Sequence, residues 1–197
     1  MKARQTIAVD IDDVLAEHIE DFLKFSNERY GTNFKPEDYH GRWHILWGIS
    51  HEEVEKRAVN FHIPETLNNF AVVKDAKEVL TELKKKYDLV IVTARPRMTV
   101  EATKEWIKNQ FTDIFSSIHF VPIWEPNNKL TKADICRKIG ADYLIDDLVR
   151  HCNLAAEVGI KPILFDRIKW AQPETPHPKI IRVNNWQEVL EYFNEEG

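Results

Sequence analysis

The chain has 197 residues, 43% of them hydrophobic and 11% aromatic, and its formal net charge is −5 at pH 7. This length suits one α/β domain with a small insertion and is too short for two full enzyme domains. The acidic balance argues against a nucleic-acid polymer or an anionic membrane surface as partner, so an anionic ligand would need positive charge supplied locally.

Targeting and membrane signals are missing from the sequence pattern. The first residues carry two basic side chains but only a short apolar run broken by Asp10, which does not resemble a signal peptide. Apolar stretches fall well below the ~18 to 20 residues that a membrane span needs. Cys136 and Cys152 lack a paired spacing, which favours reduced thiols. We therefore expect a cytoplasmic protein with no membrane partner.

Six short apolar runs predict β-strands. They cover residues 5–10, 88–93, 118–122, 142–146, 160–165 and 179–183. Between most of them, apolar residues recur at helical spacing, and Thr131 with Gly140 is typical of the two ends of one such helix. Asn185 with Glu188 indicates a capping box before the last helix. This alternation predicts a three-layer α/β fold with a doubly wound parallel sheet, which binds ligands at the carboxyl ends of its strands.

One segment interrupts the alternation directly after the first strand. It predicts a helix over residues 16–30, stopped by Gly31, and a second helix that begins at the Ser50–Glu53 capping box and runs to about residue 62. A helical insertion of roughly fifty residues has the size of a lid. We therefore expect an α/β core of residues 1–14 and 71–197 and a helical cap of residues 15–70.

The cap is rich in aromatic side chains, and they allow two interpretations. Most of them are expected to fill the core that a helical unit of this size needs, and stacking on a nucleobase or excluding water from a reactive intermediate is the alternative. The residues concerned are Trp43, His44, Trp47, Phe61 and Phe70. A proline-rich loop over residues 166–178 is expected to border the substrate entrance.

Asp10 and Asp12 end the first predicted strand. Residues two apart in a strand project to the same side, so both carboxylates can face one site and bind a hard cation such as Mg²⁺. The alternative is that these acids cap the following helix. Asp12 or Asp13 could do that alone, which would leave Asp10 buried behind apolar residues with no structural reason to be acidic.

Thr93 and Arg95 follow the second strand in the segment VTARP. A hydroxyl and free backbone N–H groups at a strand end can hold an anion, although threonine is also common in strands for structural reasons. The guanidinium of Arg95 can bind phosphate or carboxylate with two parallel hydrogen bonds. A surface salt bridge is the alternative for this side chain.

A lysine and a second acid pair follow later in the chain. Lys132 could offset charge between carboxylates and phosphate, but Lys129 stands three residues earlier, and a solvated lysine is the alternative for either. Asp146 and Asp147 end another buried strand, where adjacent carboxylates are costly unless a cation offsets their charge. Metal ligation is the simpler interpretation of this pair.

Taken in order, Asp-x-Asp, Thr, Lys and Asp-Asp at strand ends resemble the four motifs of the haloacid dehalogenase superfamily of phosphohydrolases. The resemblance covers residues 5–165, and AVDIDDVLAEH, VTARP and LIDD are most similar to the 5′(3′)-deoxyribonucleotidase group. It implies a Rossmann-like core with a cap after the first strand. It also implies a Mg²⁺-dependent phosphomonoesterase that forms an aspartyl-phosphate on small substrates, nucleoside monophosphates above all.

The resemblance also implies roles for the acids. Asp10 would be the nucleophile and Asp12 the general acid and base. Mg²⁺ would be held by the carboxylates of Asp10 and Asp146 and by the backbone carbonyl of Asp12. Asp147 would bind the ion through a water molecule or would contact the residues that ligate it.

For the phosphoryl group, the resemblance implies binding by Thr93 and the amide of Ala94, with Lys132 offsetting the accumulated charge. The fork of Arg95 completes the expected phosphate site.

Two other functions stay open at this point. The same chemistry could act on a sugar phosphate or another small phosphate. A receiver-like signalling domain also uses clustered Asp, Thr and Lys to accept phosphate, but there the lysine comes last, whereas here Lys132 precedes the second acid pair. A homodimer is also open.

Overall fold

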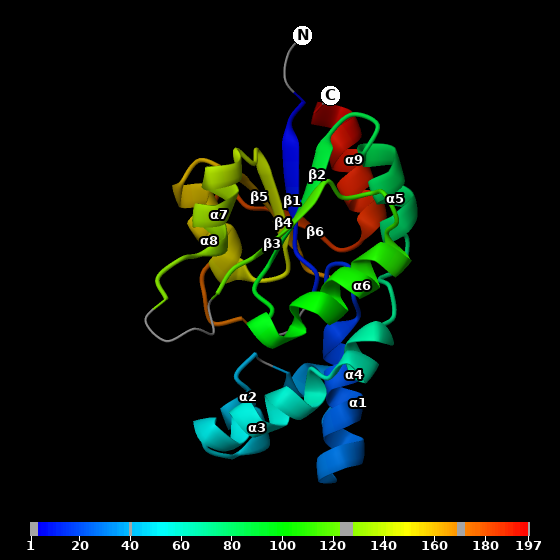
Figure 1. Ribbon diagram of the computed structural model, residues 1–197. Helices are drawn as coiled ribbons and strands as arrows, with labels where there is room; N and C mark the ends of the chain where they lie inside the picture. The colour runs from blue at the N-terminus through cyan, green and yellow to red at the C-terminus, as the bar shows by residue number, and fades with distance from the viewer. Residues whose placement is uncertain (1–3, 40, 123–127, 169–171, 197) are drawn as a thin grey trace.

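The computed structural model describes residues 4–39, 41–122, 128–168 and 172–196. Its centre is a six-stranded sheet in which every neighbouring pair is parallel, in the order β3-β2-β1-β4-β5-β6 (Figure 1). The strands are β1 (Thr6–Val9), β2 (Asp88–Thr93), β3 (Ser117–Phe120), β4 (Tyr143–Asp146), β5 (Lys161–Phe165) and β6 (Ile181–Val183). All six predicted strands are confirmed, and the order is that of a doubly wound sheet.

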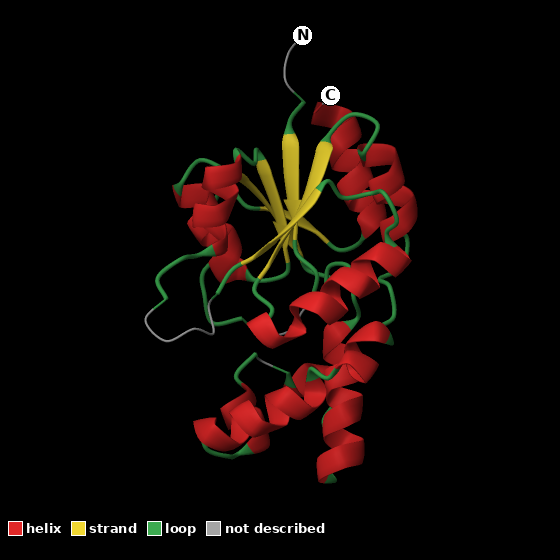
Figure 2. Cartoon of the chain, viewed as in Figure 1, coloured by secondary structure: helices red, strands yellow, loops and turns green. Residues whose placement is uncertain are grey.

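Helices cover both faces of this sheet, as Figure 2 shows. One layer holds α7 (Lys132–Ile139) and α8 (Val149–Glu157), and the other holds α5 (Ala76–Leu83), α6 (Val100–Gln110) and α9 (Trp186–Glu196). A short 3₁₀ turn, η2 (Arg97–Thr99), precedes α6. The predicted caps hold, since Thr131 and Gly140 bound α7, and Asn185 accepts the Glu188 N–H in α9. The predicted three-layer α/β fold is confirmed.

Successive residues of β1 pack alternately into the cores on the two faces of the sheet. Ile7 and Val9 belong to the larger core, which includes side chains of α5, α6 and α9, whereas Ala8 between them belongs to the core under α7 and α8. This is the two-residue period of a strand buried on both faces. Both faces of β1 are therefore buried from Ile7 to Val9, and acidic side chains follow directly where the strand ends.

The segment between β1 and α5 is helical and lies beyond the carboxyl ends of the strands (Figure 1). It contains α1 (His18–Tyr30), the 3₁₀ turn η1 (Pro36–Asp38), α2 (Trp43–Trp47), α3 (His51–Phe61) and α4 (Pro64–Asn68). As predicted, Gly31 ends α1 at a φ of 64°, and Ser50 caps α3 by accepting the Glu53 N–H. Among the described residues, every helix is too short or too polar to serve as a membrane span.

The first cap helix begins two residues later than predicted. Ala16 is held in extended backbone, because it forms β-bridges with both Asp12 and Val72. The Glu17 N–H donates to Ala71 O, and the Val73 N–H donates to Leu15 O. These bonds tie together the two chain segments that connect the sheet with the helical segment, and a helix can start only after them.

Aromatic rings fill the interior of the helical segment. Phe22 of α1 stacks on Trp43 with ring centroids 4.3 Å apart and also contacts Trp47 and Phe61. Phe61 and Phe70 are fully buried in the same core as the sheet side chains of that layer. The interpretation that most of these aromatic residues form the core is confirmed for Trp47, Phe61 and Phe70.

Candidate active site

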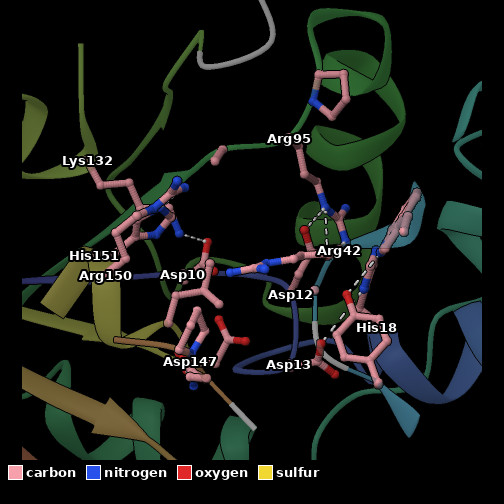
Figure 3. Close-up of a pocket in the computed structure, with 18 of the residues that line it drawn as sticks. Asp10, Asp12, Asp13, His18, Arg42, Arg95, Lys132, Asp147, Arg150 and His151 are labelled. Carbon is pink, nitrogen blue, oxygen red and sulfur yellow. Dashed lines mark hydrogen bonds and ion pairs between the residues drawn. The ribbon is translucent and has the colours of Figure 1, made fainter. Parts of the chain in front are cut away.

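Asp10 and Asp146 come together because β1 and β4 are neighbours in the sheet. The Asp10 N–H donates to Ile145 O at 3.0 Å, which continues the β1–β4 pairing by one residue beyond β1. This is the point where the strand order reverses, and a crevice for ligands opens there in sheets of this type. A pocket of about 580 Å³ lies over it, with Asp10, Asp12 and Asp147 in its wall (Figure 3).

Lys132 connects the two strand ends. Its ammonium lies 2.7 Å from Asp10 Oδ1 and 2.7 Å from Asp146 Oδ2. Because Thr131 caps α7, Lys132 is the first residue of that helix and is directed at the sheet edge, where its side chain is 2% exposed. Lys129 is exposed. Of the two candidate lysines, the structure brings Lys132 to the acids.

Asp146 is held from several sides. Its Oδ1 accepts the Leu148 N–H at 2.9 Å, and its Oδ2 accepts from Lys132 and lies 3.3 Å from His151 Nδ1. Burial alone would raise the pKa of Asp146, but the charges of Lys132 and His151 hold it well below its usual range. Asp146 is therefore an ionised, fixed carboxylate.

The pKa values of Asp10 and Asp147, in contrast to that of Asp146, are raised. Burial raises the pKa of Asp10 to about 7, with Lys132 opposing this rise and Asp146 adding to it. Burial and the charge of Asp146 also raise the pKa of Asp147 well above its usual range. The charge of Lys132 does not offset the burial of these two acids, so an additional cation would favour their ionised forms.

The acids are arranged so that they can hold such a cation. Carboxylate oxygens of Asp10, Asp146 and Asp147 all lie within 4.8 Å of one another. An all-oxygen donor set is what Mg²⁺ prefers. The donor set and the raised pKa values of two of its members therefore fit a divalent metal ion.

Asp12 is turned away from this cluster toward Arg95. Arg95 Nη2 donates to Asp12 Oδ1 at 2.6 Å, and Nε donates to the same oxygen at 3.0 Å (Figure 3). Although burial would raise the pKa of Asp12, Arg95 holds it well below its usual range. The surface salt bridge considered for Arg95 is wrong, because its side chain is 1% exposed.

Helix capping falls to a different acid. Asp13 Oδ1 accepts the Ile19 N–H of α1 at 3.0 Å. The capping interpretation therefore holds for Asp13, which leaves Asp10 and Asp12 available to the pocket.

Thr93 and Ala94 differ in their access to the pocket. Thr93 is fully buried, and its Oγ1 accepts the Arg95 N–H at 3.3 Å. Ala94 lines the pocket. The loop after β2 thus presents the segment at Ala94 to a ligand, and the Thr93 hydroxyl supports that loop from behind.

Several pocket residues escaped the sequence analysis. His18 and His62 are buried in the pocket wall, where the rings of His18, His62 and Trp43 stack with centroids 5.9–6.1 Å apart. Burial lowers the pKa of His62 to about 4 and also lowers that of His18, so both rings are neutral near pH 7. The sequence signal they offered was their position at helix ends, with His18 as the first residue of α1 and His62 directly after α3.

The rim of the pocket combines the helical segment and the sheet. Arg42 precedes α2, and Arg150 lies in the first turn of α8. The expectation that the proline-rich loop borders the entrance is confirmed for its described part, since Gln172, Pro173 and Glu174 line the pocket. Gln172 holds this loop in place by donating to Asp147 O and accepting the N–H of Val149.

Comparison with known proteins shows which family the chain belongs to. Residues 4–194 match the model of the family described as 5′ nucleotidase, deoxy (pyrimidine), cytosolic type C protein. The chain belongs to this family. It shares 30% identity with a protein of Staphylococcus epidermidis that carries the name 5′(3′)-deoxyribonucleotidase provisionally, over 97% of both chains. It is 28% identical to the 5′(3′)-deoxyribonucleotidase of Bacillus subtilis, over 94% of this chain and 96% of that one.

Solved structures agree on the fold of this nucleotidase family member. A haloacid dehalogenase-type hydrolase of Bacillus subtilis, crystallised with magnesium, superposes with a TM-score of 0.66 at 14% identity, over 98% of this chain and 100% of that one. The chain thus has the fold of haloacid dehalogenase-type hydrolases and is a phosphoric monoester hydrolase of the nucleotidase family, and the predicted family is confirmed.

Proposed function

We propose that this chain is a Mg²⁺-dependent phosphomonoesterase that works through an aspartyl-phosphate and acts on (deoxy)nucleoside monophosphates. The observation that carries the proposal is the position of Lys132, 2.7 Å from both Asp10 and Asp146 at the wall of the pocket. A buried ammonium between two buried acids can neutralise a phosphate dianion next to a carboxylate nucleophile, which would otherwise repel it.

In the first step, a carboxylate oxygen of Asp10 attacks phosphorus and the ester P–O bond breaks. The electron pair of that bond leaves with the ester oxygen, which takes a proton from Asp12. A bound phosphate dianion brings negative charge beside Asp12, and like charge favours the protonated carboxyl that this step needs. The products are the free alcohol and an acyl phosphate on Asp10.

In the second step, water attacks the phosphorus of the acyl phosphate. Asp12, now a carboxylate, accepts a proton from this water, and the bond between phosphorus and Asp10 breaks. Phosphate leaves, Asp10 is a free carboxylate again, and Asp12 is again protonated. One water is consumed for each ester, so atoms and charge balance over the cycle.

Asp10, Asp146, the backbone carbonyl of Asp12 and, directly or through water, Asp147 would hold Mg²⁺. When bound, this ion would supply positive charge for the phosphoryl oxygens and for the acids that burial leaves uncompensated. The backbone amide of Ala94, supported by Thr93 and joined by Lys132, would bind the remaining phosphoryl oxygens.

The substrate class rests on the pocket wall and on the relatives. Trp43 is half-buried, packs against the rings of His18 and His62, and contributes an aromatic surface to the same pocket as the acids. Aromatic rings of this kind bind nucleobases by stacking. The names of the curated relatives support nucleotides over sugar phosphates and over a receiver-like role.

A phosphatase screen tests the proposal. Purified protein with Mg²⁺ would be assayed for phosphate release from ribo- and deoxyribonucleoside 5′- and 3′-monophosphates, sugar phosphates and pyrophosphate. We expect nucleoside monophosphates to rank first and EDTA to abolish the activity, with recovery on adding Mg²⁺ in excess. If a sugar phosphate ranked first in the screen, the proposed substrate class would be wrong. Activity unchanged by EDTA would contradict the proposed requirement for Mg²⁺.

A further inference from the structure

Arg95 binds the Asp12 carboxylate through two nitrogens of its guanidinium. Nη2 and Nε donate to Asp12 Oδ1 at 2.6 and 3.0 Å, and Nε also lies 3.2 Å from Oδ2. The Arg95 side chain is 1% exposed, whereas that of Asp12 is 27% exposed and lines the pocket. Arg95 thus holds Asp12 from one side, and the exposed part of Asp12 faces the pocket (Figure 3).

Arg95 is itself fixed by three separate parts of the chain. Its Nη1 donates to Thr103 Oγ1 of α6 at 3.2 Å, and its backbone N–H donates to Thr93 Oγ1 at the end of β2. Its guanidinium lies over the ring of Phe70, which follows α4, at 5.4 Å from the centroid. Moving this side chain to a phosphate would break the Thr103 bond and the paired bonds to Asp12 together.

Asp12 needs such support. It stands between Asp10 and Asp13, both acidic, and Asp13 adopts a left-handed backbone with φ of 60°, so the chain turns directly after it. A carboxylate in this position has two rotatable side-chain bonds and follows the turn of the backbone unless a partner holds it. Proton transfer demands a fixed donor–acceptor geometry, and a displacement of ~1 Å can cost about 100-fold in rate.

We propose that Arg95 is a positioning residue that fixes the Asp12 carboxylate at the pocket wall and acts on the reaction through Asp12, without contacting the phosphoryl group. The inference rests on the proposed function of Asp12 as proton donor and acceptor. From the sequence, Arg95 was expected to bind the phosphate. In the structure it contacts Asp12, the residue proposed to transfer the proton.

A double-mutant cycle separates these two roles. Asp12→Asn, Arg95→Met and the double variant would be compared with wild type in steady-state and single-turnover hydrolysis of p-nitrophenyl phosphate with Mg²⁺. This ester has a good leaving group, so its cleavage stays measurable when proton donation is lost. Arg97→Met is the matched control, because Arg97 is an exposed arginine two residues after Arg95, at the start of η2.

If Arg95 acts through Asp12, Arg95→Met lowers kcat about 10- to 100-fold with KM within twofold of wild type. In the Asp12→Asn background, the same substitution then changes the single-turnover rate by less than twofold. Arg95→Lys, which keeps the charge but lacks the fork, is expected to restore part of kcat. Arg97→Met leaves both constants unchanged.

Two results would overturn the inference. An equal loss from Arg95→Met in both backgrounds, or a raised KM at unchanged kcat, would mean that Arg95 binds phosphate directly. Thermal unfolding checks each variant, and if Arg95→Met does not fold, the cycle is run with Arg95→Lys. Failure of the proposed function is distinguishable, since wild type itself would then show no metal-dependent hydrolysis.

Discussion

The two walls of the pocket differ in the side chains that form them, charged on the sheet side and aromatic on the side of the helical segment. On the sheet side, charged groups from β1, β4 and α7 compensate one another over 2.7 Å ion pairs around Lys132. On the side of the helical segment, the rings of His18, Trp43 and His62 stack, and burial keeps both histidines neutral. The difference indicates a division of work, with chemistry on the sheet and recognition of the rest of the substrate on the helices.

The largest effect on the sheet wall is expected from the nucleophile. Asp10→Asn removes the attacking oxygen at nearly unchanged volume, so phosphate release should fall by roughly 1,000-fold or more. Asp88→Asn, at the exposed start of β2, is the matched control and should leave activity unchanged. Steady-state assays with the best nucleotide substrate measure both. Near-full activity in Asp10→Asn would remove the aspartyl-phosphate from the mechanism.

The next effect separates the two candidate lysines. Lys132→Met leaves Asp10 and Asp146 without their shared counter-charge, so kcat should fall about 100-fold, and the loss of a buried ion-pair partner should cost about 3–5 kcal/mol of unfolding free energy. Lys129→Met, at an exposed position, should change neither. Activity assays and urea unfolding of both variants provide the measurement. A larger loss from Lys129→Met would reverse the assignment.

A smaller effect tests the metal cluster on the same wall. Asp147→Asn keeps the shape of a side chain but removes one of the three carboxylates that lie within 4.8 Å of one another. The Mg²⁺ concentration for half-maximal activity should rise about 10- to 100-fold, with kcat recovering at high Mg²⁺. Isothermal titration with Mg²⁺ checks the binding directly. An unchanged requirement for Mg²⁺ would place Asp147 outside the metal site.

The smallest effect belongs to the helical wall. Trp43→Ala should raise KM for a nucleoside monophosphate about 10-fold, because stacking of one base on an aromatic ring contributes about 1–3 kcal/mol. KM for ribose 5-phosphate, which lacks the base, should change by less than twofold. The ratio of the two effects is the measurement. Equal changes for both substrates would show that Trp43 supports the fold of the wall and does not read the base.

The sequence by itself determined the sheet and the acidic part of the site. Strands buried on both faces must be apolar throughout, so β1 and β4 stand out as apolar runs, and the acids that end them mark the carboxyl edge. Local capping signals were equally reliable, because Thr131 and Ser50 act on residues three positions away. These features depend on residues that are close together in the chain, so they can be read from the sequence alone.

Only the tertiary structure decided which side chains meet. Arg95 pairs with Asp12, 83 residues away, because β1 and β2 are adjacent, and α7 brings Lys132 rather than Lys129 to the sheet edge. His62 reaches the pocket wall only because the helical segment folds back over the strand ends. The partner of a charged side chain depends on distance in space, and contacts between distant segments leave no local pattern in a single sequence.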